Sequence, residues 1–360
     1  MTKQQRRKKT PQDRRAQVLC TGLTFLFFAV SLIRVEACPV CFLMPTKTVA
    51  DYIIESEFVV LARENPDIPF SYSLTERLKG QTTTEDFGLF VDSSTRRRLK
   101  ANPEDVVVLV RLNSDQEWHS LGIADAQFQE IVKRILAYAD HWKSNDGVND
   151  RYRFFLSLLG NENRTVFELA YLELGRAPYS KIKEMAEFIS PNEIRPILLR
   201  REYYQWRPLA IMLLAQNPSE KDRKLIEDSF DMCNQFSIKT NLAAWTTAYI
   251  EINGLSALDV IEEKYLSDAN RTELEIRSII IALSVHGLDG QSELRERIIK
   301  SYGLALQNHP HVTGLIVNDL KKWNKPDYRE RIREIIKQSG IQFDRKATKA
   351  IMSFLDNSSG

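Results

Sequence analysis

The sequence predicts a multidomain chain in which a small, mostly β unit is followed by an all-α array of helical repeats. Three observations predict this class. Short runs rich in Val, Leu and aromatic residues are confined to residues 57–122, and such runs favour β-strands. From residue 151 to residue 355, apolar residues recur at helical spacing between turn signals. A basic and then apolar segment precedes both units, which is typical of a targeting signal.

The targeting signal is predicted in residues 1–37. A strongly basic stretch is followed by the uncharged apolar run 18–33, and Ala37 is small enough to precede a cleavage site before Cys38. A cleaved export signal is the first interpretation. An uncleaved membrane anchor formed by residues 18–33 is the second, because basic flanks stay on the cytoplasmic side. A lipid on Cys38 is the third. All three place the rest of the chain in the periplasm or outside the cell.

Composition is that of a folded protein and speaks against a nucleic-acid partner. The chain has 360 residues, 43% of them hydrophobic, which is enough for two domains with a sizeable core. Its formal charge of +2 comes from 50 basic and 48 acidic residues. The first 37 residues hold eight of these basic and two of these acidic residues, which leaves 42 and 46, a net charge of −4. The exported part is therefore slightly acidic, whereas nucleic-acid binding needs a basic surface.

The mostly β unit is expected over residues 38–142. Its expected elements are a short helix at 46–56, strands at 57–64, 69–80 and 104–113, a last strand at 117–122 and an amphipathic helix at 125–142. The centre of the 104–113 run is nearly all Val and Leu, which predicts a strand buried on both faces. Several short strands closed by helices predict a small barrel or sandwich.

The helical-repeat unit is expected over residues 150–356, after a polar boundary at 143–150. Four stretches share one layout: an apolar helix end, a short turn with Asn or Gly, and a charged amphipathic helix. Their equivalent points are Leu213, Tyr249, Ile281 and Leu320. The offsets of 36, 32 and 39 residues give a period of about 36, within the range of two-helix repeats.

Local signals predict where some of these helices begin and end. The run from Ser190 to Glu193 combines an N-cap serine, a proline at the first helical position and a glutamate at N3. Asp327, followed by Glu330, predicts a second N-cap by the same logic. The glycines expected to end helices are Gly254, Gly287 and Gly340.

Two family resemblances follow from these patterns. The layout and period of residues 151–355 resemble HEAT-like α-solenoids. The start "CPVC" at 38–41, the helix "VADYIIES", the strand "EFVVLAR" and the next strand ending in "ERLKG" resemble exported TIMP/netrin-like domains, which implies an OB-like barrel. The spacing here is Cys-x-x-Cys, whereas the protease inhibitors of this family begin with Cys-x-Cys. Only one cysteine, Cys233, follows further along this chain. The combination resembles bacterial exported proteins that begin Cys-Pro-x-Cys.

Cys38 and Cys41 are the first candidate site. In an oxidising compartment a local disulfide is the favoured interpretation. A redox pair is the alternative, although such pairs usually open a helix after a strand, and this one precedes any strand. The pair lacks the second pair of ligands that a zinc site needs, so no metal site is expected.

Two basic clusters are candidate interaction surfaces. Arg96, Arg97 and Arg98 form the densest basic run of the exported chain, suited to an anionic lipid, a polysaccharide or an acidic partner. The second cluster combines arginines and aromatic residues in the composition of interface hot spots: Arg200, Arg201, Tyr203, Tyr204 and Trp206. The same residues also suit the core between the first repeats.

These observations favour a non-enzymatic, exported interaction or scaffold protein. It would bind another protein or a cell-envelope component through its helical-repeat surface. A thiol-disulfide oxidoreductase using Cys38 and Cys41 is the alternative enzyme, and a protease inhibitor using the mature N-terminus is a further alternative. The sequence holds no phosphate loop, nucleophile elbow or His-Glu-x-x-His motif, so no cofactor is expected. Membrane contact is expected only through the N-terminal segment.

Overall fold

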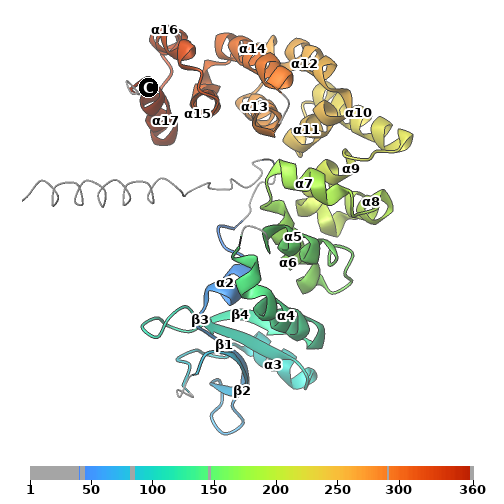
Figure 1. Cartoon of the computed structure of the whole chain (residues 1–360), viewed down its shortest axis with the longest axis vertical. Helices are drawn as coiled ribbons and strands as arrows, with labels where there is room; N and C mark the ends of the chain where they lie inside the picture. Colours follow the sequence, from blue (N-terminus) through green and yellow to red (C-terminus); the bar gives the residue numbers. More distant parts are fainter. Residues whose placement is uncertain (1–39, 41–44, 82–85, 145–146, 290–291, 357–360) are drawn as a thin grey trace, which may run out of the picture. The chain divides into compact units, whose positions relative to one another are not determined.

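The computed structural model describes residues 40, 45–81, 86–144, 147–289 and 292–356, which lie in one compact unit (Figure 1). The predicted export signal, its cleavage position at Ala37 and the pair Cys38 and Cys41 lie outside the described residues. In the described part of the chain, no helix is both long and apolar enough to cross a membrane.

The β unit contains one antiparallel sheet of four strands. The strands are β1 (Phe58–Glu64), β2 (Tyr72–Lys79), β3 (Val106–Arg111) and β4 (His119–Ala124), in the order β2-β1-β3-β4. β3 is buried over five of its six residues, as its Val-rich sequence predicts for a central strand. β2 and β4 lie at the two edges of the sheet, and the predicted last strand at 117–122 corresponds to β4.

Alternating residues of the central strands divide between two apolar layers. Val59 and Leu61 pack on the face covered by α2 (Val49–Glu55) and α4 (Ala126–Trp142). Val60 and Leu109 pack on the other face, with Leu99 of α3 (Ser93–Ala101). This division follows from the two-residue period of a strand, so the sheet lies between helices on both faces.

The apolar layer under α2 and α4 continues into the helical part of the chain. It includes residues of α5 (Gly147–Leu156) and α6 (Arg164–Gly175), and it reaches Ala248 and Val285 further on. α4 ends at Trp142 and α5 begins at Gly147, so the second half of the predicted polar boundary, 147–150, lies in α5, and both helices contribute to this shared core. The domain boundary there stays a prediction.

Buried charges also join α2 to the helices that follow. Arg151 of α5 bridges the carboxylates of Asp51 and Glu173, 2.7 Å from each. Arg176 pairs with Asp51, and the Thr48 hydroxyl donates to Glu173. Burial opposes ionisation of Asp51, but the Thr48 N–H and the two arginines outweigh it and hold the pKa of this carboxyl below its usual range. Burial raises the pKa of Glu173, against the charge of Arg151.

The rest of the described chain is helical, as the sequence predicts. The α-helices are α7 (Tyr179–Ala186), α8 (Pro191–Leu199), α9 (Arg207–Leu214), α10 (Glu220–Gln235), α11 (Leu242–Asn253), α12 (Leu255–Ile261), α13 (Glu273–Asp289), α14 (Ser292–Asn308), α15 (Thr313–Lys322), α16 (Arg329–Ser339) and α17 (Arg345–Leu355). Short helices of other types are η1 (Arg201–Trp206), η2 (Glu262–Leu266), η3 (Pro310–Val312) and η4 (Pro326–Tyr328). No strand follows β4 within the described residues.

Helices two apart in the chain pack against each other. α9 contacts α11, α11 contacts α13, α13 contacts α15, and α15 contacts α17. α12 contacts α14 in the same way. A second core, from Phe230 to Phe354, fills the space among these helices and includes Ile298 and Tyr302, both fully buried.

Three of the predicted helix ends are confirmed. Ser190 caps α8 through the predicted capping box with Glu193, and Pro191 stands at the first helical position. Gly254 ends α11 and Gly340 ends α16, both with positive φ, which glycine adopts without steric cost.

Two of the predicted helix boundaries are wrong. Asp327 lies in η4, and α16 begins at Arg329 without a side-chain cap. Gly287 lies inside α13, where a Cβ atom would stand 2.4 Å from the ring of Trp323. The glycine is therefore explained by a close helix–helix contact, which no local sequence signal reveals.

Candidate functional site

The cysteine chemistry that the sequence suggests rests on residues outside the described part of the chain. This applies to the Cys38–Cys41 disulfide, to the alternative of a thiol-disulfide oxidoreductase that uses these two cysteines, and to the alternative of a protease inhibitor that uses the mature N-terminus. Cys233 is described: it is buried on α10, and burial raises the pKa of its thiol to about 11. A thiol that stays protonated and inaccessible is a packing group and not a nucleophile.

The basic cluster of α3 is largely used within the protein. Arg96 pairs with Glu64 at 2.6 Å, and its guanidinium lies 4.6 Å from the centre of the Phe70 ring. Arg98 pairs with Asp105 at 2.9 Å. Arg97 is exposed, and its Nε donates to the carbonyl of Ser93. The predicted cluster therefore presents Arg97 and Arg98 to solvent, although Arg98 also pairs with Asp105, and Arg96 serves the fold.

A stack of aromatic rings stands beside α3. The rings of Phe70 and Phe90 lie 5.2 Å apart and nearly parallel, and Phe90 is 70% exposed. Phe70 has a φ of 66°, a left-handed conformation that is costly for an aromatic residue. The Glu64 carboxylate accepts its N–H, and its carbonyl accepts the N–H of Val91. Hydrogen bonds at both the N–H and the carbonyl of Phe70 thus hold its backbone in this strained conformation.

The second predicted cluster, at η1, is divided between core and surface. A 3₁₀-helix has three residues per turn, so Tyr203 and Trp206 share one side. Tyr203 packs on Phe167 with ring centres 4.5 Å apart, and Trp206 lies 5.3 Å from Tyr171. Trp206 is 8% exposed. These two residues belong to the core, the second of the two roles that the sequence allows.

The same three-residue period places Arg201, Tyr204 and Arg207 on another side of the turn. Tyr204 is half exposed, and the Arg207 guanidinium lies 5.3 Å from its ring centre. The Tyr204 hydroxyl lies 3.3 Å from Oγ1 of Thr240, in the loop between α10 and α11. Two helix–helix connections thus meet at Tyr204.

Exposed apolar side chains extend this region in two directions. Leu199, at the end of α8, is 80% exposed. Phe236, four residues before Thr240, is 61% exposed, and Met232 and Leu225 of α10 are 51% and 40% exposed. Spacings of four and seven residues put these last three side chains on one stripe of α10. We call this region, from Leu199 to Arg207 with the stripe and the loop 236–240, the η1 surface.

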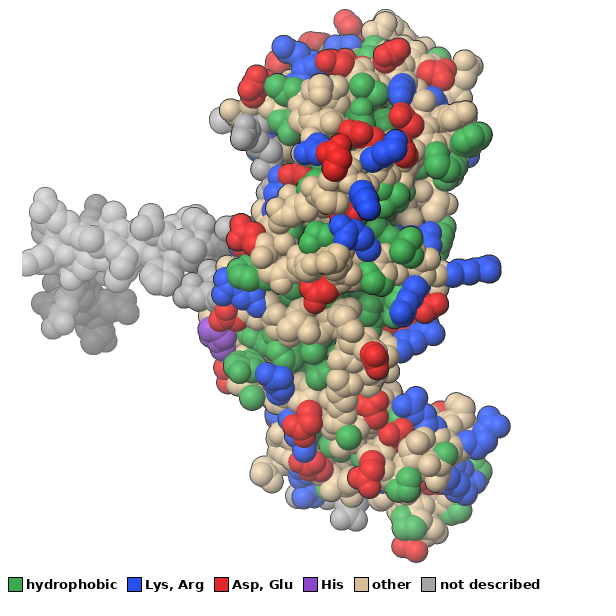
Figure 2. Space-filling view, turned by 90° about the vertical axis from the view of Figure 1, so that its right-hand side faces the viewer, with side chains coloured by type: hydrophobic (Ala, Val, Ile, Leu, Met, Phe, Trp, Pro, Cys, Tyr) green, Lys and Arg blue, Asp and Glu red, His purple; other side chains and the backbone are tan. Residues whose placement is uncertain are grey.

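The η1 surface carries a local excess of positive charge. Four cations lie in it, against one carboxylate, Glu202, which stands 4.0 Å from Arg200. The cations are Arg200, Arg201, Arg207 and Lys239. Arg164, the next cation along this side, is paired with Glu168 at 2.8 Å, so it does not change the net charge of the η1 surface. Figure 2 faces the side on which α8 and α10 lie in Figure 1, and basic, acidic and apolar side chains are interspersed there.

Sequence reasoning found the arginines and Tyr204 but missed Leu199, Phe236 and the α10 stripe. The stripe has a signal in the sequence, because Leu225, Met232 and Phe236 repeat at helical spacing. Ile226, Phe230 and Cys233, which are buried, repeat in the same way on the other side of the helix. Which of the two apolar sides is buried depends on the neighbouring helices.

A polar cluster lies where α7, α9, α11 and α13 meet. The Tyr179 hydroxyl donates to Glu251 at 2.8 Å and accepts from Gln216 at 3.0 Å. Lys183 Nζ and His286 Nδ1 lie 3.1 and 3.9 Å from the same Glu251 oxygen. The other ring nitrogen of His286 lies 2.9 Å from the Thr247 carbonyl, to which it donates. These contacts bind four helices together.

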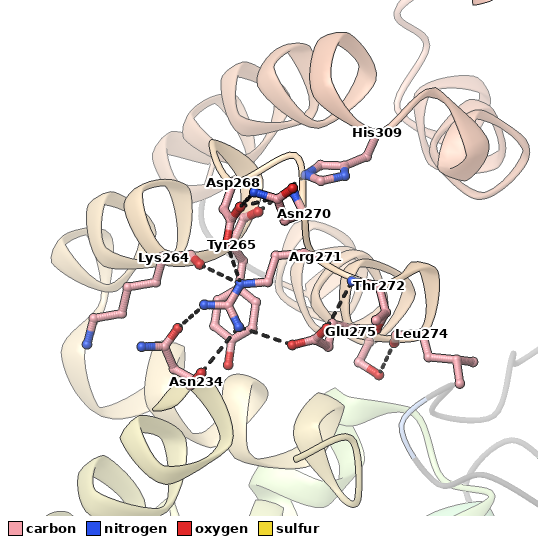
Figure 3. A network of polar contacts seen from close by, with 11 residues as sticks. Asn234, Lys264, Tyr265, Asp268, Asn270, Arg271, Thr272, Leu274, Glu275 and His309 are labelled. Atoms are coloured by element: carbon pink, nitrogen blue, oxygen red, sulfur yellow. Dashed lines mark hydrogen bonds and ion pairs between the residues drawn. The ribbon is translucent and has the colours of Figure 1, made fainter. Parts of the chain in front are cut away.

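Figure 3 shows a second polar network, around Arg271, at the connection from η2 to α13. The guanidinium lies 4.5 Å from the centre of the Tyr265 ring and donates to the Lys264 carbonyl and the Glu275 carboxylate. His309 Nε2 lies 3.3 Å from the Tyr265 carbonyl, and burial lowers the pKa of this imidazole. The described residues include no group of three side chains suited to hold a metal. The network therefore fixes a connection between helices.

Comparison with known proteins does not indicate what these surfaces bind. No protein-family model, no curated protein and no solved structure matches the chain.

Proposed function

We propose that this chain is an exported interaction protein without catalytic activity, which binds another protein or a cell-envelope component through the η1 surface. One observation carries the proposal. Leu199, Tyr204 and Phe236 are 80%, 50% and 61% exposed on one basic region, although the chain has a large core in which to bury them. Clustered exposed apolar groups mark interaction sites, and Tyr and Arg are enriched in their centres.

The proposed architecture is a HEAT-like array preceded by a small sheet domain, whose described strands form one open sheet and not the small barrel or sandwich that the sequence predicts. The period of about 36 residues and the packing of α9, α11, α13, α15 and α17 each on the next support the array. The helix α2, the strand β1 and the antiparallel pairing of β1 with β2 support the resemblance of the first part to exported TIMP/netrin-like domains. In such an array the connections between helices lie together along an edge, as the connections at Tyr204 do.

Site-specific crosslinking tests the proposal. p-Benzoylphenylalanine replaces Tyr204 in one variant and Tyr138 in another, and both are irradiated in the producing cells. Tyr138 is a matched control because it is also a half-exposed tyrosine, 45% exposed, on α4. A discrete crosslinked species from position 204 alone is the expected result. Equal yields from both positions, or none from 204, would contradict a binding role for this surface.

A further inference from the structure

We infer that the occupant of the η1 surface is an acidic segment of another protein, anchored by aromatic or aliphatic side chains. This inference rests on the proposed function and deepens it by naming the chemical class of the partner. It follows from three properties of the surface: the position of its charges, the apolar stripe beside them, and the way Tyr204 is held.

The charges favour an acidic partner. The η1 surface has a net charge of +3 within a part of the chain, residues 38–360, whose net charge is −4. Arg200 and Arg201 are exposed, and they lie next to each other at the start of η1. Guanidinium groups bind carboxylates through paired hydrogen bonds, so this pair suits a segment rich in Asp or Glu.

The apolar stripe favours a protein over a nucleic acid or a lipid surface. From Leu225 to Phe236 it runs about 16 Å along α10, three turns of helix. Asp228 and Asp231 flank it, and each is paired with a lysine, Asp228 with Lys224 at 3.2 Å and Asp231 with Lys264 at 2.7 Å. The stripe therefore offers no net positive charge along its length to a phosphate backbone or an anionic membrane. A polypeptide can place its carboxylates at the η1 end and apolar side chains along α10.

Tyr204 is the centre of this surface and is held in place before binding. Arg207 lies over its ring, the Thr240 hydroxyl lies 3.3 Å from its own, and the adjacent Tyr203 packs against Phe167 of the core. A tyrosine fixed in this way loses little conformational freedom when a partner covers it. We therefore assign Tyr204 the role of the main contact, with Arg200 and Arg201 as the carboxylate-binding groups.

Fluorescence anisotropy with a labelled random copolymer of Glu and Tyr tests the inference. The protein is used from residue 38 on, because the basic residues ahead of it would themselves bind polyanions and residues 37–360 form one compact unit. The charge-reversal variant is Arg200→Glu with Arg201→Glu. Its matched control is Arg97→Glu with Lys100→Glu, which changes the net charge equally at two exposed positions of α3.

We expect the copolymer to bind, and the η1 double variant to weaken its binding by about tenfold or more, the effect of losing a hot spot. The α3 control should change it less than twofold. Tyr204→Ala should also weaken binding about tenfold, whereas Tyr138→Ala should not, and circular dichroism must report an unchanged fold in every variant.

Three results would overturn the inference: no binding of the copolymer, equal weakening by both double variants, or tighter binding of double-stranded DNA than of the copolymer. The first and third results would reject an acidic partner but would not reject the proposed function, which the crosslinking experiment tests separately. A crosslink at position 204 in cells combined with no copolymer binding would retain the interaction surface and reject an acidic partner. Failure of both experiments would reject the surface itself.

Discussion

The close contact between Gly287 and Trp323 makes a sharp prediction about how the helices pack. Gly287 lies in α13, two residues before its last residue, and Trp323 follows α15. A Cβ atom added at Gly287 would stand 2.4 Å from both Cη2 and Cζ2 of the indole. Carbon atoms in contact are separated by 3.5–4.0 Å, so Gly287→Ala requires α13 or the indole to move by more than 1 Å.

The expected magnitude follows from two opposing effects. Alanine in a helix interior is more favourable than glycine by about 1 kcal/mol. Overpacking of a core contact costs about 1–3 kcal/mol. The ring of Trp323 cannot turn aside without losing its stack on Tyr302, at 5.6 Å between centres and 12° between planes. We therefore expect Gly287→Ala to lower the free energy of unfolding by up to about 2 kcal/mol.

Urea denaturation followed by far-ultraviolet circular dichroism measures this effect, and a double-mutant cycle isolates its cause. Trp323→Leu removes the two contacting ring atoms. In that background Gly287→Ala should stabilise the protein by up to about 1 kcal/mol, because only helix propensity remains. If Gly287→Ala already stabilises the protein with Trp323 in place, the helices do not approach as described and the packing argument fails.

Three further predictions concern other parts of the described chain. Asp51→Asn should cost about 3 kcal/mol at pH 7. Because the pKa of Asp51 is lowered on folding, this stabilisation is present above the unfolded value near pH 4 and is lost as the pH falls through the lower folded value, so the two urea midpoints should converge in acid. Phe70→Ala should be less stable than Phe70→Gly by about 1 kcal/mol in thermal unfolding, because only glycine adopts the positive φ freely; equal stability would contradict the strained backbone. With Cys20, Cys38 and Cys41 replaced by Ser, the Cys233 thiol should react with an aromatic disulfide reagent only after unfolding, and reaction of the native protein would contradict its burial.

The elements of this fold could be predicted from the sequence to the extent that they depend on local periodicity. The Val-rich run of β3, the amphipathic α4 and the capping box of α8 were all readable from neighbouring residues. Gly287 was not, because a glycine that ends a helix and one that admits a ring 36 residues away look the same in sequence. The buried pair of Arg151 and Glu173 was also missed, since its partners lie on separate helices.

The candidate site could be predicted in part, for a related reason. Arginine and tyrosine at 200–206 mark an interface by composition, whereas the sorting of these residues between core and surface depends on which side of the turn meets the neighbouring helix α6. A three-residue turn sends Tyr203 and Trp206 inward together and leaves Tyr204 outside. An α-helix would also place Tyr203 and Trp206 on one side, so the period alone does not say which side is buried; the contacts with Phe167 and Tyr171 decide it.

This sorting decides which substitutions can report on binding. Trp206 and Tyr203 pack on Tyr171 and Phe167, so replacing them removes core contacts, and loss of binding in such variants would follow from loss of stability. Tyr204 contributes a half-exposed ring that contacts Arg207 and Thr240 at the surface. A variant at this position alters the proposed contact area and leaves the core beneath it in place. The core residues of η1 therefore act as supports that fix where Tyr204 stands, and Tyr204 is the position at which stability and recognition can be separated.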